Sequence, residues 1–373
     1  MAEATVDWTG AFGRLVKRES LSREELAALY LQALSDPQGY QNVILTLFAT
    51  LSTKGATEEE LNGMGDAMNR CCTFQRIPAL EDRVVTIAGT GGDTIKTVNV
   101  SSAAALVAAG AGALVGKFGA RAVSSVSGAV DVMEAVGVNI HGSTEVVQRC
   151  LDEVGISFGA AADYYPWITW LEQTLRGPYG AAFAPVIVPT LRPSLMAAMI
   201  NPFGPVRYMR GVVSPDTERV AHFMRARGYR RALVIYGRGP QEGLFLDEVS
   251  NVGETVITEL RDQRLETHTV APEEFGLKRA TPDEIQGGQT LSEQAQLLVD
   301  ILKGQEEGPR REIVLMNAAV LLRLADLAED LPAGVEAAAR SIDSGAALEK
   351  LRGLVEKSGG DLGRLEGFVG QSM

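Results

Sequence analysis

One glycine-rich loop has residue types that suit the binding of an anion. Gly89, Thr90, Gly91, Gly92 and Asp93 lie between the β-branched run RVVTIAG and the helical sequence NVSSAAALVAAG. Glycines let backbone amides approach a ligand closely, and the helix N-terminus adds partial positive charge, so pyrophosphate would fit here. The loop matches neither GxGxxG nor GxxxxGK[ST], which excludes a dinucleotide site and a P-loop. A plain turn between a strand and a helix is the alternative.

Three short polar side chains open the helix that follows this loop. They belong to Asn99, Ser101 and Ser102. Such side chains can contact a bound phosphate, but helix capping alone would explain one or two of them. Their assignment to a ligand site therefore depends on the loop before them.

Two further groups of residues suit a phosphorylated substrate and a metal ion. Lys117 and Arg121 lie at the end of the next predicted strand, ahead of a serine run that includes Ser125. Both cations suit a phosphate, although most cations at a strand end are simply solvated. Asp247 and Glu248 in GLFLDEVS supply adjacent carboxylates for a hard cation such as Mg²⁺, which prefers oxygen ligands. Taken alone, an acidic pair is most often a surface turn.

The elements that would position these residues alternate between strand and helix. The run RVVTIAG, the loop, the helix and the apolar run ALVGKFG form a strand, loop, helix and strand in order. Helices such as SPDTERVAHFMRARG separate some of the later strands, which predicts an α/β domain with a largely parallel sheet. Further strands are predicted at Val138–His141, Ile156–Ala161, Met209–Val213, Arg231–Gly237 and Val256–Leu260.

Both ends of the chain are predicted to be helical. Capping boxes at Ser22 with Glu25 and at Thr57 with Glu60 precede two helices near the N-terminus. The sequences TLSEQAQLLVDILKG and EIVLMNAAVLLRLADLAEDL predict helices near the C-terminus. The segment Tyr164–Gly204, rich in aromatic residues and proline, interrupts the α/β alternation. We interpret it as an insertion or crossover that covers a site. The expected domains are a helical one at 1–72, joined by part of 163–204, and an α/β one at 73–373.

Composition and charge limit the class of protein. The 373 residues carry 35 basic and 47 acidic side chains, a formal net charge of −12, which argues against nucleic acid or an anionic membrane as partner. No apolar run has the length of a membrane-spanning helix, and the acidic N-terminus shows no secretory signal. Cys71, Cys72 and Cys150 lack the spacing of metal ligands, so a reducing cytoplasm fits best.

Taken together, these segments resemble one known family. GTGGDTIKTVNVSSAAALVAAGAGALVGKFGARAVSSVSGAVDVMEAVGVNI closely resembles the phosphate-binding core of the anthranilate phosphoribosyltransferases, which share their fold with the pyrimidine nucleoside phosphorylases. LSREELAALYLQAL and KGATEEELNGMGDAM resemble the N-terminal helices of that family, and GLFLDEVS resembles its acidic motif. GPRREIVLMNAAVLLRLA and SGAALEKLRGLVE resemble its C-terminal helices, and all these segments occur in the order of the family.

The resemblance implies a small helical domain joined to a larger α/β domain, a homodimer, and phosphoribosyl pyrophosphate (PRPP) bound with Mg²⁺ between the domains. It implies phosphoribosyl transfer to an aromatic nitrogen acceptor such as anthranilate, a step of tryptophan biosynthesis. Catalysis would rest on positioning and charge neutralisation, with Lys117 and Asp93 as catalytic residues and no covalent nucleophile. By motif, Ser101, Asp247 and Glu248 would hold Mg²⁺. The residues that would bind PRPP are Gly89, Thr90, Gly91, Gly92, Asp93, Asn99, Ser101, Ser102, Lys117 and Ser125.

The acceptor half of the family pattern is altered in this chain. Where the family usually reads Lys-His-Gly-Asn-Arg, the sequence is KFGAR at 117–121, and the Tyr-His-Pro of the family becomes YYP at 164–166. The family arginine that pairs with the anthranilate carboxylate aligns with Arg176, and Arg192 is a rival. Loss of three polar groups favours a bulkier or less polar acceptor over neutral drift in an anthranilate enzyme. The predicted acceptor pocket comprises Phe118, Gly119, Ala120, Tyr165 and Arg176.

Two other functions fit the same fold. A nucleoside phosphorylase shares it, but GTGGD together with Asp247 and Glu248 fits the transferases better. A non-catalytic or nucleic-acid-binding relative is disfavoured by the negative net charge and by the intact donor motif.

Overall fold

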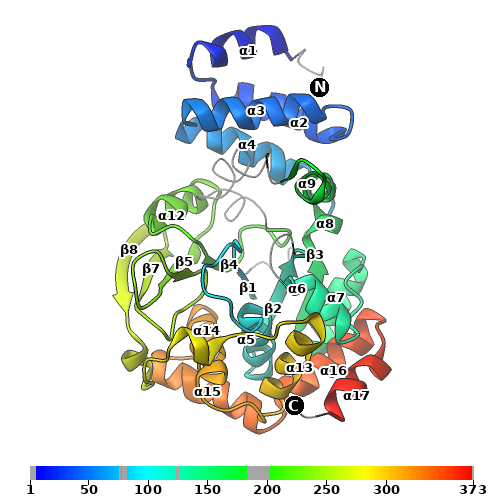
Figure 1. Cartoon of the computed structure of the whole chain (residues 1–373), viewed down its shortest axis with the longest axis vertical. Helices are drawn as coiled ribbons and strands as arrows, with labels where there is room; N and C mark the ends of the chain where they lie inside the picture. The colour runs from blue at the N-terminus through cyan, green and yellow to red at the C-terminus, as the bar shows by residue number, and fades with distance from the viewer. Residues whose placement is uncertain are drawn as a thin grey trace. The chain divides into compact units, whose positions relative to one another are not determined.

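The computed structural model describes residues 6–74, 77, 82–122, 126–180, 182 and 201–371. The chain divides into two units, a helical one of Met1–Thr73 with Ala162–Pro202 and an α/β one of Phe74–Ala161 with Phe203–Met373 (Figure 1). Ser125 and Arg192, which the sequence singles out, lie outside the described residues.

The helical unit is built from segments whose ends carry strong capping signals. Both predicted capping boxes form, with Ser22 and Glu25 at the start of one helix and Thr57 and Glu60 at the start of another. Glu60 is buried and pairs with Lys54 at 2.8 Å, so its charge is compensated inside the unit. The helices are α1 (Trp8–Val16), α2 (Arg23–Ser35), α3 (Gln41–Lys54), α4 (Glu58–Arg70), α8 (Ala161–Tyr164) and α9 (Pro166–Arg176).

The α/β unit is organised around one mixed sheet. Its strand order is β3-β2-β1-β4-β5-β7-β8, and β6 pairs with β5. The strands from β3 to β5 run parallel, whereas β6, β7 and β8 are added antiparallel. The strands are β1 (Val84–Ala88), β2 (Leu114–Gly119), β3 (Ile156–Ala160), β4 (Arg207–Gly211), β5 (Arg231–Arg238), β6 (Phe245–Leu246), β7 (Thr255–Arg261) and β8 (Arg264–Val270).

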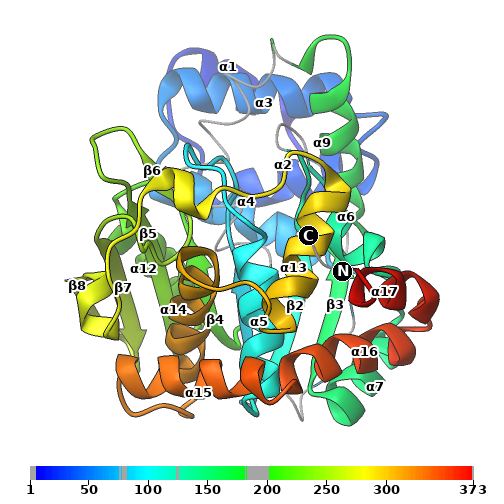
Figure 2. The same ribbon diagram turned by 60° about the horizontal axis from the view of Figure 1, so that its bottom comes forward.

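Helices cover the sheet and close its core. Helices α5, α13, α14 and α16 gather on one face (Figure 2), where they pack on strand residues such as Ile87 and Met209. Helix α12 belongs to the other face, where Thr217 and Thr258 share a hydrogen bond of 2.7 Å. The helices are α5 (Val100–Gly110), α6 (Ala129–Ala135), α7 (Thr144–Val154), α12 (Thr217–Ala226), α13 (Leu291–Leu302), α14 (Pro309–Leu324), α15 (Leu331–Asp343), α16 (Ala346–Ser358) and α17 (Leu362–Val369), with 3₁₀ turns η2 (Pro272–Phe275) and η3 (Pro282–Ile285).

One predicted strand is wrong, and two observed strands, β6 and β8, were not predicted. Residues Val138–His141 form no strand, because Asn139 bonds through its backbone and its side chain to Ser358 at the end of α16. Strand β8 was missed because it lies at the edge of the sheet and most of its residues are exposed and polar. Among the residues that the structure describes, no helix is both long and apolar enough to cross a membrane.

Candidate functional site

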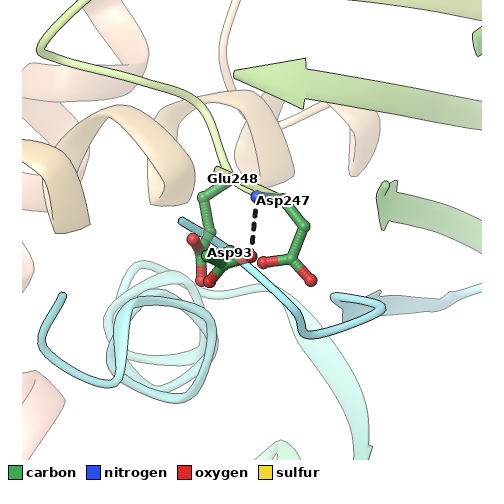
Figure 3. A group of neighbouring side chains, drawn as sticks. All are labelled: Asp93, Asp247 and Glu248. Atoms are coloured by element: carbon green, nitrogen blue, oxygen red, sulfur yellow. Dashed lines mark hydrogen bonds between the residues drawn. The ribbon is translucent and has the colours of Figure 1, made fainter. Parts of the chain in front are cut away.

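Three carboxylates from distant parts of the chain meet at one edge of the sheet. Asp93 follows β1, and Asp247 and Glu248 follow β6; their oxygens lie within 4.8 Å of one another (Figure 3). The Asp247 amide donates to Asp93 Oδ1 at 3.2 Å, and the Gly91 amide donates to Asp247 Oδ2 at 2.6 Å. Asp247 is only 5% exposed and Glu248 only 9%. The acidic pair is therefore a buried part of a cluster and not a surface turn.

Two glycines at neighbouring strand ends let the acidic segment reach this position. Gly89 directly follows β1 and Gly211 ends β4, and these strands are paired in the sheet. A Cβ at Gly89 would overlap the Asp247 carboxylate, and one at Gly211 would overlap the Asp247 backbone carbonyl. The chain runs from β1 to β2 on one side and to β4 on the other, so this edge is the topological switch point where α/β sheets bind ligands.

The cluster is electrostatically unfavourable without a counter-charge. Burial raises the pKa of Glu248 well above its usual range, and the neighbouring charges of Asp247 and Asp93 raise it further. Burial and then Asp247 raise the pKa of Asp93 in the same way. Glu248 Oε2 is buried and has no hydrogen-bond partner among the described residues. Oxygen ligands in this arrangement fit a hard divalent cation such as Mg²⁺.

One residue that positions the acidic segment was missed by the sequence reasoning. Asn317 of α14 is fully buried, and its Oδ1 accepts the Val249 amide while its Nδ2 donates to the Val249 carbonyl, both at 3.0 Å. This paired contact holds the backbone directly after Glu248. A lone Asn inside the apolar run EIVLMNAAVLL was the available signal, because a buried amide needs partners.

The glycine-rich loop and the start of α5 carry polar groups that nothing nearby satisfies. The Thr90 and Ser102 hydroxyls are buried and lack a partner within the described residues. Asn99 is the N-cap residue of α5, but its side chain makes no capping hydrogen bond, and Ser101 is half-buried beside it. Gly91 and Gly92 both have positive φ, a backbone conformation that residues with a side chain mostly avoid. The Gly91 amide is already used by Asp247.

Lys117 lies inside the sheet and not at its solvated end. It is 2% exposed, and its Nζ donates to the Phe118 carbonyl at 3.0 Å and lies 5.8 Å from the centre of the Phe158 ring. Burial and the charge of Arg210 lower its pKa to about 8, while the charges of Asp247 and Glu248 oppose that shift. Lys117 is therefore electrostatically linked to the carboxylate cluster.

The predicted acceptor residues are divided between the two units. In the α/β unit Phe118 is buried, Gly119 is half-buried and Ala120 is exposed. In the helical unit Tyr165 is fully buried and Arg176, at the end of α9, is exposed. Arg121, the second cation considered for a phosphate, is instead paired with Asp131 and Glu134 at 3.1 and 2.8 Å. Arg121 is therefore neutralised by these two carboxylates and does not pair with Asp93, Asp247 or Glu248.

Comparison with known proteins assigns the family. The family described as "Glycosyl transferase family, a/b domain" matches residues 81–348. The chain is 39% identical to the anthranilate phosphoribosyltransferase of Desulfosudis oleivorans over 353 residues, covering 92% of this chain and 96% of that protein. The chain belongs to the anthranilate phosphoribosyltransferase family. A second family member, from Anaeromyxobacter dehalogenans strain 2CP-1, is 39% identical over 346 residues. The match covers 97% of that protein.

Solved structures of the family share the fold. The anthranilate phosphoribosyltransferase of Thermus thermophilus matches with a TM-score of 0.79 and 31% identity, covering 93% of this chain and 99% of that one. The Saccharomyces cerevisiae enzyme in complex with PRPP and Mg also has a TM-score of 0.79, at 22% identity, covering 96% of this chain and 99% of that one. The yeast comparison shows the shared fold, and its ligands are those of the yeast protein.

Proposed function

We propose that this chain is a Mg²⁺-dependent phosphoribosyltransferase that transfers the phosphoribosyl group of PRPP to the amine of anthranilate or a related aromatic compound. The observation that carries the proposal is the buried cluster of Asp93, Asp247 and Glu248 beside a glycine-rich loop and a helix N-terminus. Family members with close sequences bear the same activity in their names. A site that combines anion-binding amides with carboxylates for a metal suits a magnesium pyrophosphate.

The donor would bind at the loop and the start of α5. The unsatisfied hydroxyls of Thr90 and Ser102 and the uncapped side chain of Asn99 provide donors and acceptors for phosphate oxygens. The N-terminus of α5 adds partial positive charge. Within the loop, Gly92 has a positive φ, a conformation that glycine adopts without strain, and Gly89 leaves room for the Asp247 carboxylate beside the loop. Ser125 remains a predicted member of this site.

The carboxylates fit Mg²⁺, which the yeast enzyme holds in its complex with PRPP. Asp247 and Glu248 would hold Mg²⁺, with Asp93 next to them and Ser101 as a predicted further ligand. When bound, Mg²⁺ supplies positive charge that offsets the repulsion between these carboxylates and the phosphate oxygens of the donor. The unpartnered Oε2 of Glu248 is the specific observation that supports this fit.

The chain would accelerate the reaction by positioning and by charge. The nitrogen lone pair of the amine forms a bond to the anomeric carbon, the bond from that carbon to pyrophosphate breaks with its electron pair, and the nitrogen releases a proton. Lys117 adds positive potential near the leaving group. The loop backbone holds the pyrophosphate so that the opposite side of the ribose stays open to the amine. No side chain has to form a covalent bond.

The acceptor pocket of Phe118, Gly119, Ala120, Tyr165 and Arg176 stays a prediction. The aromatic side chain of Phe118 supports an acceptor with a flat apolar ring. As further proposals, the enzyme acts in the cytoplasm as a homodimer in tryptophan biosynthesis. The buried Cys150 thiol suits a reducing compartment. Light scattering on the purified chain tests the dimer.

Isothermal titration with PRPP tests the proposed donor and metal. With Mg²⁺ we expect micromolar to millimolar affinity, and in EDTA much weaker binding, because Asp93, Asp247 and Glu248 would repel the phosphates. The matched control is Glu242→Gln, which removes an exposed charge from the same segment and should leave the metal dependence unchanged. Equal affinity in EDTA would contradict the metal site. A lack of PRPP binding with Mg²⁺ would contradict the transferase function.

A further inference from the structure

Arg210 is a buried cation without an ion-pair partner among the described residues. It lies near the carboxyl end of β4 and is 6% exposed. Its Nη1 donates to the Tyr208 hydroxyl at 2.9 Å, and its guanidinium carbon lies 5.9 Å from the centre of the Tyr208 ring. Its Nε is buried with no hydrogen-bond partner, and no carboxylate in the described part of the chain forms an ion pair with it. Arg207 at the start of the same strand is paired with Asp326 at 2.8 Å.

Burial of a cation without an ion-pair partner generally costs free energy. A guanidinium cannot lose its proton at physiological pH, so burial without an anion leaves an uncompensated charge. Lys117 adds a second buried positive charge, and the charge of Arg210 lowers the pKa of Lys117 while Asp247 and Glu248 raise it. The positive potential around Arg210 therefore favours an anion that comes from outside the chain. The Tyr208 contacts hold the guanidinium in a defined orientation for it.

The sheet register decides on which face this anion would lie. Arg210 is aligned with Ala88 and Tyr208 with Thr86, while Ile87 and Met209 between them point into the core that contains α5. Because side chains alternate along a strand, Arg210 and Tyr208 point away from α5. The Phe118 ring lies on this same face, 6.4 Å from the Tyr208 ring centre to centre. Arg210 thus shares its face with the predicted acceptor residue and not with the helix of the donor site.

We propose that Arg210, and not the exposed Arg176 expected from the resemblance, binds a carboxylate substituent of the aromatic acceptor and so determines which amines the enzyme accepts. The guanidinium would form charge-assisted hydrogen bonds with the carboxylate, Tyr208 would orient the guanidinium, and Phe118 would contact the acceptor ring. The proposal rests on the transferase function proposed above and adds the residue that selects its acceptor. Neutral aromatic amines lack the group that Arg210 requires.

The test compares two acceptors that differ in charge. Steady-state release of pyrophosphate from PRPP is measured with anthranilate and with its neutral amide, 2-aminobenzamide, for the wild type, Arg210→Met and Arg210→Lys. For Arg210→Met we expect kcat/KM to fall roughly 100-fold with anthranilate and to change little with the amide, because a charged hydrogen-bonded contact is lost for one acceptor only. Arg210→Lys keeps the charge but not the planar fork, so its loss should be intermediate.

A matched control and a stability measurement separate binding from a structural role. Arg207→Met changes the same side chain in the same strand and should leave the ratio of the two kcat/KM values unchanged. The melting temperature of Arg210→Met should be equal to or higher than that of the wild type, because an unpaired buried charge is removed. A lower melting temperature with equal losses for both acceptors would mean a structural role and would overturn the proposal.

Two further outcomes would also overturn it. If Arg210→Met raises KM for PRPP equally with either acceptor, the anion belongs to the donor. If the ratio of acceptor kcat/KM values is unchanged, Arg210 does not select the acceptor, while the transferase function stands. Absence of pyrophosphate release by the wild type with both acceptors would instead show that the proposed function is wrong, and the inference with it.

Discussion

Replacing Glu248 by glutamine should stabilise the metal-free protein while abolishing its response to Mg²⁺. Glu248, Asp247 and Asp93 hold their oxygens within 4.8 Å of one another. At an effective dielectric constant of about 20, two unit charges at that distance repel by about 3.5 kcal/mol. The substituted glutamine would keep the shape of the side chain and remove the charge. It could also donate a hydrogen bond to a neighbouring carboxylate.

Protonation sets the upper limit of this gain. The wild-type cluster can relieve repulsion by protonating Glu248, which at pH 7 costs about 3.5 kcal/mol for a carboxyl of ordinary pKa. Repulsion beyond that amount leads to proton uptake and not to further destabilisation. We therefore expect Glu248→Gln to raise the free energy of unfolding in EDTA by between about 1 and 3.5 kcal/mol.

The gain should depend on pH with a defined sign. The folded-state pKa values of Glu248 and Asp93 are raised above their unfolded values. The free energy of unfolding is therefore not reduced by these groups below their unfolded pKa, at about pH 4. It falls as the pH rises through their folded pKa, because the groups then become charged in the folded protein. The glutamine substitution removes the Glu248 part of this loss. Its stabilising effect should be larger at pH 8 than at pH 5.

Thermal unfolding in EDTA and in Mg²⁺, at both pH values, measures these effects. Glu242→Gln is the control, because it removes the same charge from an exposed position on the same segment. Mg²⁺ should raise the melting temperature of the wild type and of the control, and barely affect Glu248→Gln. If Glu248→Gln lowers the melting temperature in EDTA, or responds to Mg²⁺ like the control, the cluster is not a repulsive metal site.

Three other variants test the residues that support the acidic segment and the residues of the predicted acceptor pocket. Asn317→Ala should raise the Mg²⁺ concentration required for half-maximal turnover about tenfold or more, because the Val249 backbone loses both hydrogen bonds. A titration of activity against Mg²⁺ measures this concentration. Gly211→Ala should displace the acidic segment, lower turnover and lower the melting temperature of the ligand-free protein, because its Cβ would overlap the Asp247 backbone carbonyl; kinetics and thermal unfolding measure the two effects. The triple change Phe118→His, Ala120→Asn and Tyr165→His should raise anthranilate turnover if loss of polar groups altered the pocket, with each hydrogen bond contributing about 1 kcal/mol. Robust turnover by the wild type and no gain in the triple variant would mean that the pocket tolerates these residues.

Local signals predicted much of the fold. The capping boxes at Ser22 and Thr57 formed because they need only residues three positions apart. Strands β3 and β5 were predicted nearly to their ends, since short β-branched and apolar runs bounded by glycine or charge are distinctive. By contrast, the strand expected at Val138–His141 did not form. Whether an extended segment joins a sheet depends on the hydrogen-bond partners of its backbone, and here the Asn139 amide bonds to Ser358.

The sequence by itself determined the family and the chemical character of the site. GTGGD and the acidic pair of GLFLDEVS indicate phosphate and metal ligands from their residue types alone, because those types carry the chemistry wherever they lie. Only the tertiary structure decided that Asp93 joins Asp247 and Glu248, since 154 residues separate the first two and the glycines of two paired strands allow the contact. It also decided that Arg210 is buried with no ion-pair partner in the described part of the chain. Burial and pairing depend on neighbours distant in the chain, and no local pattern contains them.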